Sequence, residues 1–141
     1  CKIMSRVELQ DYEKFVASTI SPASSDVNSF RVRIDELLSD SKQFNVKIPE
    51  LLTAAVGLPA EAGEFTEVVK KTVFQGKPLT EDNIFHLKRE LGDLCWYLAV
   101  ACKALNTSLD EVLVMNVEKL SARYPQGFEI IKSEVRKEGD V

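Results

Sequence analysis

Two long helical segments, separated by one short turn, constrain the fold of this chain more than any other feature of its sequence. The first begins near Pro49, because proline suits the first turn of a helix, and runs towards Gly76. A turn around Pro78 follows, and Thr80 is placed to cap a second segment that continues to about Leu105. Apolar side chains recur along both segments with helical spacing, and no convincing strand pattern is present. The sequence therefore predicts an all-α fold, with these two long helices at the centre of a helical bundle.

Shorter segments flank the two long ones. A first amphipathic helix is expected to end at the turn-forming residues 21–26. A second, short helix follows, with Phe30, Ile34, Leu37 and Leu38 on one face. Residues 41–48 are expected to form a loop. The last helix has Ser108 as its predicted cap and stops at Tyr124, because a proline follows. The expected architecture is a helical bundle of four to five helices.

Length and charge narrow the class of protein. The chain has 141 residues, enough for one domain, which we place at residues 4–128, with 129–141 as a charged, mobile tail. The 18 basic residues are outnumbered by 22 acidic ones, so broad nucleic-acid binding by phosphate neutralisation is not expected. No apolar run approaches the ~18 residues of a membrane span, and Cys95 and Cys102 are too far apart on one helix for a disulfide. A cytoplasmic protein with no membrane or nucleic-acid partner is expected.

Paired acidic residues stand on each of the long predicted helices. Glu61 and Glu64 occupy the first, and Glu90 and Asp93 occupy the second. A spacing of three residues puts both members of a pair on one helix face. Both helices are rich in apolar residues, so part of this acidic face is expected to point into the bundle. Four converging carboxylates are tolerable when cations neutralise them, and oxygen ligands without cysteine or histidine suit Mg²⁺ or Mn²⁺.

Other interpretations of these acids stay open. A single Glu-x-x-Glu is more often a solvated helix face than a metal site. A di-iron or di-manganese site uses Glu-x-x-His on two helices, whereas the chain's single histidine, His86, precedes Glu90 by four residues. We therefore expect His86 to be a surface or helix-start residue rather than a ligand.

Three further residues near the acids affect the helix itself. Pro59 is expected to kink or break the first long helix just before Glu61, because it removes a backbone hydrogen bond. Gly63 and Gly92 lie inside the two acidic pairs, where helix propensity disfavours them. Glycine at these positions permits close approach of a ligand or of the neighbouring helix.

With these motifs in order along the chain, the sequence resembles a known family. The stretches are LLTAAVGLPAEAGEFTEVVKK, then KRELGDLCWYLAVA, then NVEKLSARYP. They resemble the MazG-like all-α nucleoside triphosphate pyrophosphohydrolases, especially the small phage-type members, over roughly residues 51–128. The resemblance implies that the acidic pairs bind Mg²⁺, with Mn²⁺ as a possible substitute, and form the catalytic centre: Glu61, Glu64, Glu90 and Asp93. The family motif has one more glutamate, and its position here is Ala60.

The resemblance also implies a set of substrate-binding residues. It assigns Asn116, Lys119 and Arg123, which form one stripe on the last helix, to the triphosphate. A solvated basic helix end is the alternative for these three residues. Tyr97 is similar to the family tyrosine that contacts the nucleotide sugar, although a core tyrosine fits the sequence almost as well. Trp96 is expected in the core.

The implied activity is Mg²⁺-dependent hydrolysis of (deoxy)nucleoside triphosphates to nucleoside monophosphate and pyrophosphate. The resemblance further implies a homodimer or homotetramer, which closes a site that one small subunit leaves open, and a location in the host cytoplasm if the chain is phage-encoded. Two alternatives remain. One is a non-catalytic helical module that binds a protein partner. The other is a narrower pyrophosphohydrolase for dUTP or for a phosphoribosyl-nucleotide.

Overall fold

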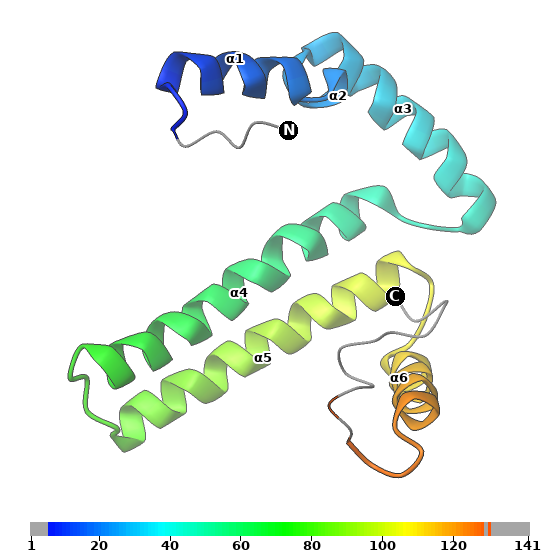
Figure 1. Cartoon of the computed structure of the whole chain (residues 1–141). Coiled ribbons are helices and arrows are strands. Elements are labelled where there is room, and N and C mark those ends of the chain that lie inside the picture. The colour runs from blue at the N-terminus through cyan, green and yellow to red at the C-terminus, as the bar shows by residue number, and fades with distance from the viewer. Residues whose placement is uncertain (1–5, 129, 131–141) are drawn as a thin grey trace. The chain divides into compact units, whose positions relative to one another are not determined.

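The computed structural model describes residues 6–128 and residue 130 (Figure 1). Over these residues the chain is all-α, which confirms the predicted fold class, and its helices number six. They are α1 (Leu9–Thr19), α2 (Pro22–Ser25), α3 (Val27–Phe44), α4 (Ile48–Phe74), α5 (Glu81–Ala104) and α6 (Leu109–Arg123). The count exceeds the expected four to five because α2, a single turn, forms within residues 21–26, where a turn was predicted.

The chain divides into two compact units, Cys1–Phe44 and Asn45–Val141. In the first unit α2 packs against α3, and Asp26 accepts a 2.8 Å hydrogen bond from the backbone N–H of Ser29 in the first turn of α3. None of the helices described in this unit buries a side chain fully.

The second unit is built on a hairpin of α4 and α5, which lie side by side along their length (Figure 1). The apolar residues buried in its described part are Ala54, Val68 and Ala104. Two of the three are alanines, and short side chains let helix axes approach closely. The backbone N–H of Lys47 donates a 2.9 Å hydrogen bond to the carbonyl of Ala104, so the start of α4 is tied to the end of α5.

The structure corrects two sequence predictions. The predicted loop at 41–48 is mostly helical, because α3 continues to Phe44 and α4 already begins at Ile48. Asn45 ends α3 with a φ of 54°, a left-handed conformation that asparagine tolerates better than most residues. Pro59 does not break α4, which is one continuous helix from Ile48 to Phe74. The hairpin contacts along α4 outweigh the one hydrogen bond that proline removes.

The predicted helix caps of the second unit are confirmed. Thr80 accepts a hydrogen bond from the Asn83 N–H at the start of α5, and Ser108 does the same for Glu111 at the start of α6, each at 3.2 Å. The charged tail predicted at 129–141 lies outside the described residues, apart from Ile130. None of the helices described here has the length and hydropathy needed to cross a membrane.

Candidate functional site

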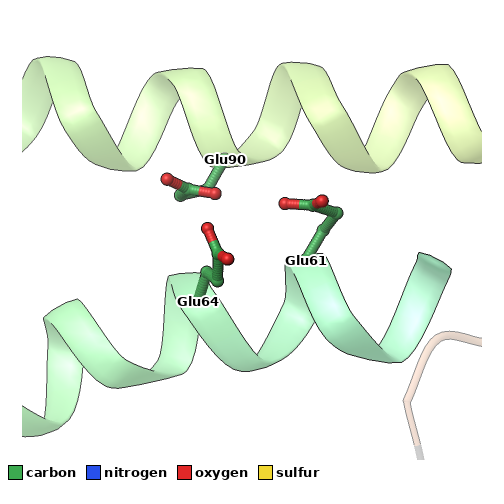
Figure 2. Close-up of side chains that lie close together, drawn as sticks. All are labelled: Glu61, Glu64 and Glu90. Atoms are coloured by element: carbon green, nitrogen blue, oxygen red, sulfur yellow. The ribbon is translucent and has the colours of Figure 1, made fainter.

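Three of the four predicted acids converge between α4 and α5. Glu61 and Glu64 come from α4 and Glu90 comes from α5, and Figure 2 shows their carboxyl groups pointing towards one another. One oxygen from each of the three lies within 4.8 Å of the others. The spacing of three on α4 puts Glu61 and Glu64 on the face that packs against α5, as predicted.

Glu90 is the buried member of this group. It is only 4% exposed and is the one buried charged residue in the part of the chain described. Its Oε1 lies 3.1 Å from Nε2 of His86, which is an ion-pair contact when the imidazole is protonated, whereas its buried Oε2 has no hydrogen-bond partner. A buried carboxylate oxygen without a partner is costly, so its environment favours an added positive charge.

The electrostatics of Glu61 agree with this conclusion. Partial burial raises the pKa of Glu61 above its ordinary value, and neighbouring negative charges raise it further. Those charges belong, in decreasing order of effect, to Glu64, Asp93 and Glu90. The group therefore repels itself when ionised, and a divalent cation bound there would relieve the repulsion.

Asp93, the fourth predicted acid, lies nearly one turn further along α5. It is exposed and is not one of the three residues whose oxygens converge. Its charge still acts on Glu61, so it belongs to the same electrostatic environment. The donor set of three converging carboxylates, with Asp93 nearby, fits a hard divalent cation such as Mg²⁺ or Mn²⁺.

A cavity of about 360 Å³ lies beside these carboxylates, and Glu64 is on its wall. Lys71, Lys77 and His86 bring nitrogen groups to the same cavity. Sequence reasoning did not place Lys77 or His86 at the site. The signal for His86 was its position one turn before Glu90, on the same face of the helix.

Glu67 extends the acidic face of α4 away from the three converging carboxylates. It pairs with Lys70 at 2.9 Å and with Lys71 at 3.0 Å. Hydrogen bonds from these two ammonium groups lower the pKa of Glu67 to about 2. Glu67 is therefore already neutralised, unlike Glu61 and Glu90.

Residues 50–128 match the model of the MazG nucleotide pyrophosphohydrolase domain. This chain belongs to the MazG family. It is also similar to the "Gene 37 protein" of Mycobacterium phage L5, with 38% identity over 74 residues, or 51% of this chain. The aligned part spans 64% of that phage protein. No solved structure matches the chain.

The MazG match covers α4, α5 and α6, which carry all the predicted site residues. Position 60, where the MazG-like motif would have its further glutamate, is an alanine on the cavity wall. The first unit, with α1 to α3, lies outside the matched residues.

Tyr97 is half-buried and packs on α4. Its ring lies so close to Gly57 that a methyl group built on that glycine would overlap it. The Trp96 ring contacts Tyr97 edge-on, with the ring centroids 5.0 Å apart. Trp96 is 59% exposed, so the expectation of a core tryptophan is wrong. Gly63 and Gly92 have open space where a side chain would begin, so the α4–α5 contact does not require them.

The three polar residues predicted to hold the triphosphate, Asn116, Lys119 and Arg123, lie on α6. α6 follows the C-terminal end of α5, whereas Glu90 lies in the N-terminal half of α5 (Figure 1). None of the three belongs to the group of converging carboxylates. The Arg123 guanidinium lies 5.8 Å from the centre of the Tyr124 ring. Their role in substrate binding stays a prediction.

Proposed function

We propose that this MazG-family chain hydrolyses (deoxy)nucleoside triphosphates between the α and β phosphates, releasing nucleoside monophosphate and pyrophosphate. One observation carries the proposal. The buried Glu90 keeps an unpartnered oxygen beside the carboxylates of Glu61 and Glu64, in a chain whose matched region is a nucleotide pyrophosphohydrolase domain. A divalent cation would neutralise such a site, and Mg²⁺ is commonly bound by one or two carboxylates together with substrate phosphates.

In this proposal Glu61, Glu64 and Glu90 hold Mg²⁺, or Mn²⁺ in its place, and Asp93 completes the negative charge of the site. A bound divalent cation supplies charge neutralisation at the phosphate oxygens and lowers the pKa of water. The oxygen of a water molecule forms a bond to the α phosphorus, and the bond from that phosphorus to the α–β bridging oxygen breaks. A carboxylate of the group accepts the proton of the attacking water.

The leaving pyrophosphate carries the remaining negative charge. We assign its stabilisation to Lys119 and Arg123, with Asn116 as a hydrogen-bonding partner of the triphosphate. Tyr97 is the candidate contact for the sugar. Because these residues lie on α6 and on the C-terminal half of α5, the nucleotide would extend from the carboxylates towards the α6 side of the unit.

The product pair tests the proposed reaction. The chain is incubated with Mg²⁺ and each common ribo- and deoxynucleoside triphosphate, and the products are separated by ion-exchange chromatography. Monophosphate and pyrophosphate in equal amounts are expected. Diphosphate and phosphate would contradict the assignment of the cleaved bond. Turnover of dUTP alone, or of phosphoribosyl-nucleotides alone, would narrow the substrate, and no turnover of any nucleotide would favour a protein-binding module.

We also propose that the active form is a homodimer or homotetramer. Apolar side chains on α6, among them Leu113, Val117 and Leu120, are exposed at helical spacing, and the hairpin buries few apolar groups. A second copy would cover this surface and bring further side chains to the open site. Light scattering at micromolar concentration should give a multiple of 15.8 kDa. A fully active monomer would contradict this part of the proposal.

A further inference from the structure

His86 and Glu90 form an unequal pair on α5. They are one helical turn apart, and Nε2 of His86 lies 3.1 Å from Oε1 of Glu90, within ion-pair distance. The imidazole is 51% exposed, whereas the carboxylate side chain is only 6% exposed. Exposed pairs one turn apart on a helix contribute little and are common on surfaces. This pair differs because one of its members is a buried charge.

The exposed pairs of Glu67 show the contrast on the neighbouring helix. Glu67 and its two lysine partners are each between 44% and 48% exposed, and both carboxylate oxygens of Glu67 are engaged by lysines. Glu90 instead has one oxygen engaged and one left without a partner. The contact with His86 therefore distinguishes between the two oxygens of Glu90.

This difference between the two oxygens affects how the Glu90 carboxylate can bind a metal ion. A carboxylate can rotate about its last side-chain bond, and a hydrogen bond to one oxygen limits that rotation. With Oε1 occupied by His86, the oxygen left for a cation shared with Glu61 and Glu64 is Oε2. His86 itself lines the cavity beside Glu64, so its contact with Glu90 lies at the edge of the site.

We propose that His86 is a positioning residue, which fixes the Glu90 carboxylate so that Oε2 serves as the metal ligand. His86 does not contact the metal in this arrangement. The inference rests on the proposed function, since it assumes that Glu61, Glu64 and Glu90 bind a divalent cation. It changes the interpretation of His86 from a surface residue to part of the site.

The test measures Mn²⁺ and Mg²⁺ affinity of the nucleotide-free protein by isothermal titration calorimetry. His86→Leu removes the donor and keeps an apolar side chain of comparable reach. It should weaken metal binding by about 10- to 100-fold, the usual effect of losing a group that orients a ligand. His86→Gln supplies an amide N–H that can reach the same oxygen, and should recover most of the affinity. Arg33→Ala, which removes an exposed pair with Glu36 on α3, is the matched control and should bind metal normally.

Kinetics give a second measurement. In His86→Leu the Mg²⁺ concentration for half-maximal turnover should rise, while the rate at saturating Mg²⁺ falls much less, because the metal is still able to bind when abundant. Unchanged metal affinity in a folded His86→Leu, with normal metal binding by the parent chain, would overturn this inference alone. Absence of metal binding by the parent chain would overturn both the inference and the proposed site. Equal losses in His86→Leu and His86→Gln would also contradict the donor role.

Discussion

At the scale of single residues, the carboxylates of α4 are held in two different electrostatic states. Glu67 is neutralised by lysines, whereas Glu61 has a raised pKa because of partial burial and neighbouring acids. Spacing alone does not distinguish the two, because Glu61, Glu64 and Glu67 all recur at intervals of three. The difference arises from the neighbouring charges: Glu67 pairs with Lys70 and Lys71 on its own helix, whereas the charges that act on Glu61 belong to other acids of α4 and α5.

Glu67 leads to a prediction about pH. Its pKa is lowered from 4.5 to about 2 in the folded chain. The pairing therefore stabilises the fold above pH 4.5, and this contribution is lost as the pH falls from 4.5 towards 2. The stability difference between the parent and Glu67→Gln, from urea unfolding at several pH values, should be constant near neutrality and shrink over that interval. Because the side chains of Glu67 and Lys70 are about half exposed, added salt should reduce this stability difference. A difference that grows on acidification would contradict the assigned pairing.

Arg123 gives the residue-scale prediction for substrate binding. If it stabilises the leaving pyrophosphate, Arg123→Ala should lower kcat/KM by about 100- to 1000-fold, whereas Mg²⁺ affinity without nucleotide stays nearly unchanged. Arg123→Lys should recover only part of the rate, because an ammonium group cannot reproduce the bidentate guanidinium contact. Steady-state kinetics measures the change in kcat/KM, and calorimetry measures the Mg²⁺ affinity of the nucleotide-free protein. Kinetics of Arg123→Ala within about twofold of the parent would instead indicate a solvated helix end.

At the scale of helices, the contact between Tyr97 and Gly57 fixes how α4 and α5 pack near the site. Replacing glycine by alanine inside a helix ordinarily stabilises it by about 1 kcal/mol. At Gly57 the added methyl group would overlap the Tyr97 ring, so we expect Gly57→Ala to lower Tm. Gly92→Ala is the matched control: open space surrounds that position, and Tm should rise slightly. Thermal unfolding followed by circular dichroism measures both, and a Tm increase in both variants would contradict the described packing.

At the scale of the whole molecule, the sequence allowed the fold class, the two long helices and the N-terminal caps of α5 and α6 to be predicted. These features depend on local chemistry, such as the hydroxyl groups of Thr80 and Ser108 at helix starts. Continuity through Pro59 was not predictable, because it depends on contacts with the neighbouring helix. The length of α3 was missed because the polar residues 41–43 resemble a loop, although Ser41 donates a hydrogen bond to the Leu38 carbonyl within the helix.

In the candidate site, too, features set by local spacing were predictable, whereas features set by helix packing were not. Convergence of Glu61, Glu64 and Glu90 follows from their spacing on two apolar helices, and the sequence predicted it. Burial distinguishes these acids, and it depends on the packing of α4 against α5. Sequence reasoning therefore gave no reason to single out Glu90, and His86 was taken for a surface residue. The roles of Asp93 and of the α6 residues stay predictions.

The acids between α4 and α5 are proposed to form a catalytic divalent-metal site, and every other role assigned here depends on that site. The most direct measurement is the Mg²⁺-dependent rate of pyrophosphate release from a deoxynucleoside triphosphate by Glu64→Gln, compared with the parent and with Glu36→Gln on α3. We predict a loss on the order of 100-fold or more for Glu64→Gln, with helical content retained, and no loss for Glu36→Gln. A folded Glu64→Gln that retains the parent rate and its Mg²⁺ dependence would contradict the claim.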